Sequence, residues 1–199
     1  MSLILFGTSR SRAFRALWML EETGLPFEHR PLVPERCGAD ADYLGVNPAG
    51  TIPCLADDDF VLTESLAINL WLANRTGVLK PEGSRGDALA MQWSLWAATT
   101  LEPAYVRWAE HTAWLPAPQR DAAQAQTALQ ELARPLRRLD GVLSGQDGLL
   151  GDAFTVADLN VASVIPLLRH IDADGFEHVA RWLARATARD AYARAGARP

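Results

Sequence analysis

Three short polar segments in the first third of the chain carry the side chains best suited to chemistry. Residues 8–11 read Thr-Ser-Arg-Ser, and residues 63–65 read Thr-Glu-Ser where a helix is expected to begin. A helix N-terminus with free N–H groups is a natural site for an anion. Residues 50–53 read Gly-Thr-Ile-Pro and put a proline inside a predicted strand, where its ring is poorly tolerated. We therefore predict a cis peptide bond between Ile52 and Pro53.

The elements that must position these segments form a small α/β layer. Apolar runs predict strands at residues 3–6, 27–32, 52–56 and 60–63, and helical spacing predicts helices at 13–22 and 65–74. Residues 34–42 are polar and are predicted to be irregular. The three aspartates at 57–59 are predicted to form the tip of a β-hairpin rather than a metal site. The order β-α-β, β-hairpin, α is that of a thioredoxin-like domain.

The rest of the chain has the pattern of helices. Residues 79–86 hold glycines, a proline and charges, which is typical of a linker. Helices are predicted at 87–114, 119–143, 156–171 and 177–194, and Thr155 with Asp158 forms a capping box at the start of the third. The predicted fold class is α/β plus all-α, with a thioredoxin-like domain at 1–78 and a helical bundle at 87–199.

Composition excludes several classes of function. The 199 residues carry 19 basic and 24 acidic side chains, a net charge of −5, whereas proteins that bind nucleic acid have a basic surplus. No apolar run approaches the roughly 18 residues of a membrane helix. The N-terminus lacks the pattern of a signal peptide, so we expect a cytoplasmic protein with neither nucleic acid nor membrane as a partner. The two cysteines, Cys37 and Cys54, and the four histidines show no metal-ligand spacing, and no metal is expected.

Four motifs in one order give the chain a specific resemblance. They stand at residues 11–26, 47–53, 63–68 and 154–158. In these segments, which lie along nearly the whole chain, the sequence resembles the cytosolic glutathione S-transferases, in particular serine-type, bacterial-like members. The resemblance implies a homodimer with glutathione as co-substrate.

The resemblance also implies how glutathione would be held. Ile52 would offer its backbone to the cysteinyl part, and Pro53 in the cis form would keep that backbone open. Glu64 would meet the γ-glutamyl ammonium, since a carboxylate is a fitting partner for it. Ser65 with its amide would bind the γ-glutamyl carboxylate at the helix N-terminus. Arg36 is the basic residue placed to hold the glycine end.

The residue that would activate the sulfur is left open among three hydroxyls. In serine-type members the activating hydroxyl falls at Thr8, with Ser9 next to it. Thr8 and Ser11 have the spacing of a redox CxxC motif but carry no thiol, so chemistry through an enzyme cysteine is not expected. We keep Thr8 and Ser9 as equal candidates and Ser11 as a third. The alternative is that these hydroxyls only cap the helix.

A hydrogen bond from one hydroxyl, together with the helix N-terminus, can lower the pKa of the glutathione thiol enough to ionise it near neutral pH. A free thiol has a pKa of about 8.5, and lowering it by about two units requires roughly 2.7 kcal/mol of preferential stabilisation of the anion. A hydrogen bond to a charged acceptor contributes about 1.5–3 kcal/mol, and a helix N-terminus roughly 0.3–1 kcal/mol. Together these contributions suffice without a metal or a general base.

The predicted function is transfer of the glutathione thiolate to electrophilic, mostly apolar compounds, a detoxification reaction. Leu101, Tyr105 and Trp108 are predicted to line the acceptor pocket. Two alternatives stay open. One is another glutathione-dependent activity (isomerase, dehalogenase or peroxidase) on the same fold, and the other is a non-catalytic binding module that kept the fold.

Overall fold

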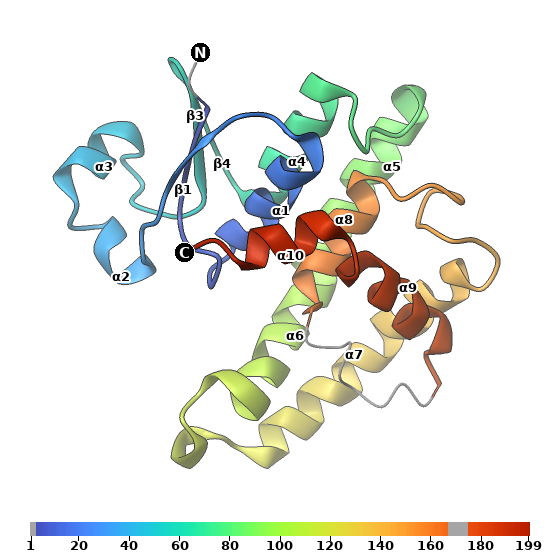
Figure 1. Cartoon of the computed structure of the whole chain (residues 1–199). Coiled ribbons are helices and arrows are strands. Elements are labelled where there is room, and N and C mark those ends of the chain that lie inside the picture. The colour runs from blue at the N-terminus through green and yellow to red at the C-terminus, as the bar shows by residue number, and fades with distance from the viewer. Residues whose placement is uncertain (1–2, 167–174) are drawn as a thin grey trace. The chain divides into compact units, whose positions relative to one another are not determined.

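The computed structural model describes residues 3–166 and 175–199 and separates into two compact units (Figure 1). Met1–Lys80 together with Ala188–Pro199 forms the first unit, and Pro81–Thr187 forms the second. The sequence predicted a first domain at 1–78, a linker at 79–86 and a second domain at 87–199. The two units differ from these predicted domains mainly because residues 188–199 belong to the first unit.

A four-stranded sheet forms the centre of the first unit. In sheet order its strands are β2 (Glu28–Arg30), β1 (Leu3–Phe6), β3 (Cys54–Asp57) and β4 (Phe60–Thr63). β1 is parallel to β2 and antiparallel to β3, and β3 is antiparallel to β4. The turn at Asp58 and Asp59 joins β3 to β4, which confirms the predicted hairpin.

Helices lie on both sides of this sheet (Figure 1). α1 (Ala13–Thr23) and α4 (Ser65–Thr76) pack together on one side, and α2 (Pro34–Cys37) and α3 (Ala41–Val46) lie on the other. The prediction of an irregular segment at 34–42 is wrong. Pro34 begins α2, and the Asp40 carboxylate caps α3 by accepting a hydrogen bond from the Tyr43 N–H at 2.9 Å. Sheet and helices together confirm the thioredoxin-like fold.

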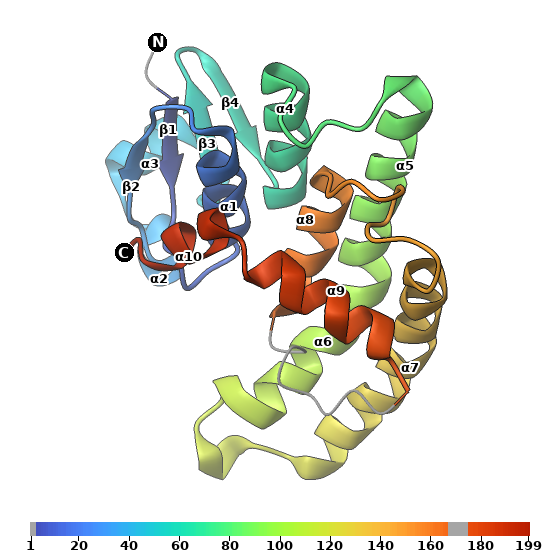
Figure 2. The same cartoon turned by 45° about the vertical axis from the view of Figure 1, so that its right-hand side comes forward.

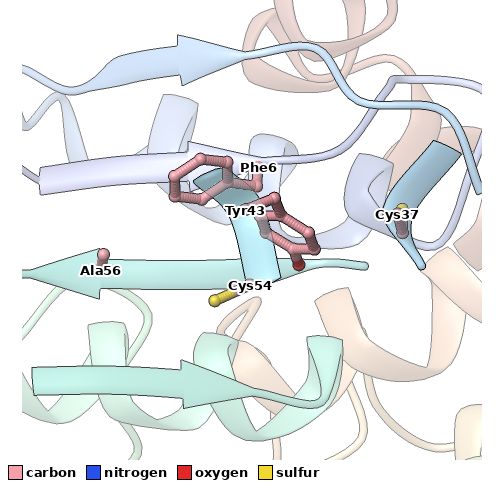
Figure 3. Packing of buried hydrophobic residues seen from close by; sticks show 5 residues of the cluster. All are labelled: Phe6, Cys37, Tyr43, Cys54 and Ala56. Carbon is pink, nitrogen blue, oxygen red and sulfur yellow. The ribbon is translucent and has the colours of Figure 1, made fainter. Parts of the chain in front are cut away.

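A small apolar core joins the sheet to α2 and α3. Figure 3 shows the rings of Phe6 and Tyr43 lying against each other. Their centroids are 5.1 Å apart. Cys37, Cys54 and Ala56 complete the cluster, and all of its members are buried. Both cysteines are therefore small core residues, and neither is in a disulfide.

The C-terminal helix α10 (Asp190–Gly196) packs against α1 inside the first unit (Figure 2). The Tyr192 ring meets the rings of Phe14 and Trp18 edge-on, with centroid distances of 5.0 Å to each. The sequence predicted a single helix at 177–194, and this is wrong. α9 (Glu177–Thr187) ends before α10 begins because the chain turns at Arg189 into extended backbone.

Ion pairs fasten this C-terminal segment to the acidic end of α1. Arg189 binds the Glu22 carboxylate through two nitrogens, at 2.6 and 2.8 Å. Arg194 and Arg198 share the Glu21 carboxylate, at 2.8 and 2.6 Å. Both carboxylates are largely shielded from solvent, so these pairs contribute more than the usual surface ion pair.

The second unit is helical throughout, apart from connecting loops, over the residues that the structure describes. Its helices are α5 (Gly83–Trp96), α6 (Glu102–Ala109), α7 (Ala122–Leu143), α8 (Val156–Val164) and α9. The chain is helical without a break from 83 to 114, so the long helix predicted at 87–114 is confirmed, with a π-helical segment inside it at Ala97–Leu101 and another at its end at Glu110–Trp114. α8 covers the first part of the helix predicted at 156–171, and residues 167–171 lie outside the described residues.

The predicted capping box at the start of α8 is confirmed. The Asp158 carboxylate accepts hydrogen bonds from the N–H and the hydroxyl of Thr155, both at 2.9 Å. It also accepts from the Leu149 N–H at 2.7 Å and from the Trp182 indole N–H at 2.9 Å. Asp158 is fully buried, and burial raises its pKa above the ordinary value while these bonds act in the opposite direction.

Residues 3–166 and 175–199 contain neither a membrane-spanning helix nor a cluster of metal-binding side chains. No helix there is both long enough and apolar enough to cross a bilayer. No group of three or more His, Cys, Asp or Glu side chains is gathered there as metal ligands would be.

Candidate functional site

The turn between β1 and α1 has a fixed shape that only glycine at position 7 permits. Gly7 has a φ of 127°, and a Cβ added to it would lie 2.5 Å from the Cβ of Ala13. The Gly7 N–H donates to the Arg30 carbonyl at 3.1 Å, and the His29 Nε2–H donates to the Gly7 carbonyl at 2.7 Å. Burial lowers the pKa of His29. Residues 8–11 therefore leave the sheet in a defined direction.

Ser11 uses its hydroxyl to close this turn. Its Oγ–H donates to the Thr8 carbonyl at 2.9 Å, and its Oγ accepts from the Ala13 N–H at 3.1 Å. A serine hydroxyl has one hydrogen to donate. Ser11 is therefore engaged in closing the turn and capping the start of α1.

Ser9 is bound to the C-terminal segment. Its hydroxyl donates to the Arg198 carbonyl at 2.6 Å, and its N–H donates to the Pro199 carbonyl at 3.1 Å. A carbonyl oxygen cannot donate, so the single hydroxyl hydrogen of Ser9 must lie in the bond to Arg198. No sequence pattern pointed to this contact, because it joins residues at opposite ends of the chain.

Thr8 differs from both serines. Its hydroxyl forms no hydrogen bond with any residue in 3–166 or 175–199, and its side chain is half-buried. The sequence left three hydroxyls as candidates. In this structure Thr8 is the one whose hydroxyl hydrogen is available to a ligand.

Thr8 opens onto a cavity of about 690 Å³, a volume within the usual range for small-molecule sites. Three stretches of the first unit line it: residues 8–10, residues 33–35 and residues 196–199. The walls are partly apolar, from Val33, Pro34 and Pro199, and partly charged, from Arg10, Glu35 and Arg198.

The loop before β3 presents its backbone beside the sheet, and the Ile52–Pro53 peptide bond is cis, as predicted. The Thr51 carbonyl accepts hydrogen bonds from the Tyr43 hydroxyl and, at 2.8 Å, from Asn47 Nδ2. Burial raises the pKa of Tyr43 to about 12, so its hydroxyl stays protonated and donates at every physiological pH. Tyr43 and Asn47 thus hold the chain immediately ahead of Ile52.

The corner between β4 and α4 has an unusual backbone. Glu64 has a φ of 67°, which is uncommon for a residue with a side chain, and it is exposed. Such strain often marks a ligand site, because the surrounding fold must maintain it. Ser65 follows as the buried first residue of α4, and the N-terminus of a helix is a favourable place for an anion.

Arg15 is a member of this corner that the sequence reasoning missed. It lies on the buried side of α1, is only 8% exposed, and its Nη1 donates to Ser65 Oγ at 3.5 Å. An arginine among the apolar residues of a helix was the signal that could have found it. A buried guanidinium beside Ser65 increases the positive potential at the N-terminus of α4.

The remaining predicted residues lie elsewhere. Arg36 is exposed on α2. In the second unit Leu101 and Tyr105 are buried, while Trp108 is half-exposed, with its ring 6.0 Å from that of Tyr105. Their part in binding glutathione or an acceptor stays a prediction.

A thioredoxin-like unit with a cis-proline loop, joined to a helical unit, defines a class of two-domain proteins. Comparison with known families shows to which of them this chain belongs. The glutathione S-transferase N-terminal domain matches residues 10–75, and the glutathione S-transferase C-terminal domain matches residues 86–190. The chain therefore belongs to the glutathione S-transferase family and is a transferase.

Individual relatives agree with this assignment. Glutathione S-transferase GstB of Escherichia coli strain K12 is 34% identical over 157 residues, which cover 76% of this chain and 75% of that protein. Human glutathione S-transferase theta-1 is 30% identical over 203 residues, covering 94% and 83%. The theta class enzyme of Xanthomonas axonopodis pv. citri, solved with glutathione bound, has a TM-score of 0.89 and 28% identity, covering 98% and 97%.

Proposed function

We propose that this transferase binds glutathione in its first unit and uses the Thr8 hydroxyl to keep the glutathione thiol ionised. The observation that carries the proposal is the difference among the three hydroxyls of the β1–α1 turn. Ser9 and Ser11 already donate to backbone carbonyls, whereas Thr8 donates to no described residue. Thr8 also lines the cavity into which the sulfur would project.

Glutathione would lie along the cis-proline loop and the start of α4. The Ile52 backbone would pair with the cysteinyl part, since Tyr43 and Asn47 already fix the neighbouring Thr51 carbonyl. Glu64, exposed at the corner, would bind the γ-glutamyl ammonium. The relative from Xanthomonas axonopodis has glutathione bound, which supports this ligand.

The γ-glutamyl carboxylate would bind at Ser65. The hydroxyl and the N–H of Ser65, at the N-terminus of α4, would donate to it. The buried Arg15 guanidinium, in contact with Ser65 Oγ, would favour the negative charge. Arg36 on α2 would hold the glycine end.

The transfer itself needs no further catalytic group. The thiol proton leaves to solvent, and the Thr8 O–H donates a hydrogen bond to the thiolate. The sulfur lone pair then forms a bond to the electrophilic carbon of the acceptor while the leaving group departs with the electrons of its own bond. Holding the two reactants together supplies much of the remaining acceleration.

The proposal is tested by removing the hydroxyl without changing the shape of the side chain. Thr8→Val should raise the pKa of the bound thiol by about 1–2 units and lower kcat/KM about 10–100-fold, since one charge-assisted hydrogen bond is lost. Glutathione affinity should change little, because the tripeptide is held elsewhere. The measurements are the thiolate absorbance of the complex against pH and the steady-state kinetics.

Two further variants make this test specific. Thr8→Ser should restore the low thiol pKa, and Ser9→Ala should leave that pKa where it is in the unaltered chain. A low thiol pKa in Thr8→Val, or its loss in Ser9→Ala, would contradict the assignment to Thr8. The same variants, assayed for isomerisation, dehalogenation and peroxide reduction, show which reaction uses the thiolate.

We also propose that the protein is a cytoplasmic homodimer that detoxifies small electrophiles. Each unit has apolar side chains that a second copy could cover. The first unit exposes Phe60 and Val61 on β4, and the second exposes Leu89, Met91 and Leu95 on α5. Exposed apolar clusters of this kind are common at protein–protein interfaces.

A further inference from the structure

The cavity next to Thr8 is more highly charged than an apolar acceptor would require. Arg10 lies in the same turn as Thr8, is exposed, and forms no ion pair or hydrogen bond with any residue that the structure describes. An arginine without a partner at the mouth of a cavity is free to bind a ligand through its planar fork of N–H donors.

A second source of positive potential lies in the wall formed by residues 196–199. The Arg198 guanidinium lies over the Phe27 ring, 4.3 Å from its centroid, and donates to Glu21 at 2.6 Å. Glu21 also receives Arg194 at 2.8 Å, so two guanidinium groups share one carboxylate. The charges of these three side chains sum to +1. Glu35 is the one acidic side chain among the lining residues of the described structure, and Pro199, the last residue of the sequence, also lines the cavity and adds a backbone carboxylate.

The position of glutathione leaves this space to the second substrate. None of the residues that we propose to hold glutathione lines the cavity, whereas Thr8 does; these residues are Ile52, Glu64, Ser65 and Arg36. Its apolar walls at Val33 and Pro34 suit a small hydrocarbon or aromatic body. In the proposed complex the cavity would therefore adjoin the sulfur without holding the tripeptide.

We propose that this cavity is the acceptor site and that Arg10 selects electrophiles that carry a carboxylate on an apolar body. The inference rests on the proposed function. The guanidinium of Arg10 would bind the carboxylate with paired hydrogen bonds, which orients the acceptor as well as attracting it. Glu35 opposes the same carboxylate, so Arg10 and Glu35 together set the charge preference.

The test uses two acceptors that differ only in charge. Both are aryl chlorides activated by two nitro groups, one with a carboxylate and one with a carboxamide para to the chlorine. In each, the sulfur bonds to the ring carbon and chloride leaves with the bonding electrons. Arg10→Gln should lower the ratio of kcat/KM for the carboxylate to kcat/KM for the carboxamide about tenfold. Glu35→Gln should raise this ratio, and Arg137→Gln, which removes an exposed arginine from α7, should leave it unchanged.

Each outcome separates the acceptor from glutathione. An unchanged ratio in Arg10→Gln overturns the proposal. A rise in the KM for glutathione with both acceptors also overturns it, because Arg10 would then hold the glycyl carboxylate of the tripeptide. A chain that binds glutathione but turns over neither acceptor, with its thiol pKa unshifted, refutes the proposed function itself.

Discussion

Three hydroxyls within four residues have different tasks because each hydroxyl has a single hydrogen. Ser11 gives its hydrogen to the Thr8 carbonyl and Ser9 gives its own to the Arg198 carbonyl. The Thr8 hydroxyl has no hydrogen-bond partner among the described residues, so its hydrogen is available for the thiolate contact that we propose. The functional group is the same in all three, so the positions of nearby backbone carbonyls decide the outcome.

The Tyr43 hydroxyl also donates its single hydrogen to a backbone carbonyl, that of Thr51 ahead of the cis-proline. Removing this hydroxyl tests what the hydrogen bond contributes. Tyr43→Phe should destabilise the protein by about 1–1.5 kcal/mol, since the hydroxyl no longer donates to the Thr51 carbonyl or accepts from Asn47 Nδ2, while the bond from Asn47 to that carbonyl remains. Glutathione should bind severalfold more weakly because the backbone ahead of Ile52 is less well held. Urea unfolding and calorimetric titration measure the two effects.

The matched control is Asn47→Ala, which removes the other donor to the same carbonyl. Like Tyr43→Phe, this variant should bind glutathione more weakly than the unaltered chain. A Tyr43→Phe variant that unfolds more readily but binds glutathione normally would show that the loop does not depend on this hydrogen bond.

At the scale of elements, one carboxylate connects the start of α8 to two other parts of the second unit. Asp158 accepts hydrogen bonds from Thr155, from Leu149 and from Trp182 of α9. Four donors would lose their acceptor together if it were removed, and all of them are buried.

Asp158→Ala should therefore lower the free energy of unfolding by about 3–4 kcal/mol, through the lost cap and the buried donors left without partners. Asp158→Asn keeps an acceptor oxygen in the same place and should cost clearly less. Denaturant titration compares the two. Equal losses in both variants would mean that the charge of Asp158, not its hydrogen-bonding capacity, stabilises α8.

At the scale of the whole molecule, Ala188–Pro199 returns to the unit in which the chain began. Tyr192 packs on α1, and Arg194 and Arg198 bind Glu21 near the end of that helix. Burial acts to raise the pKa of Glu21, but the hydrogen bonds and charges of Arg194 and Arg198 outweigh it and lower the pKa below 4.5.

A lowered pKa in the folded state contributes stability above the unfolded value, and this contribution is lost as the pH falls through the folded value. The stability difference between the unaltered chain and Glu21→Gln should therefore be largest near neutrality and shrink below about pH 4.5. Melting temperatures of both proteins against pH measure it. A difference that stays constant into acid would show that the Glu21 carboxylate does not stabilise the fold through its charge.

Local chemistry in the sequence determined a large part of this protein. The order of strands and helices, the hairpin at Asp58, the cis bond before Pro53 and the capping box at Thr155 each depend on neighbouring residues, so their signals are readable along the chain. The family follows from the same motifs. Residues 34–42 were missed because the caps at Pro34 and Asp40 start helices too short to show a period.

The tertiary structure alone decided which hydroxyl is available and what surrounds it. Ser9 is engaged by Arg198, which is 189 residues away in sequence, and Arg15 reaches Ser65 across 50 residues. The charge of the cavity likewise depends on Arg198 and Arg194 sharing one carboxylate. Such contacts join side chains and carbonyls from distant segments, and no spacing along the chain encodes them, because only folding brings the partners within hydrogen-bond distance.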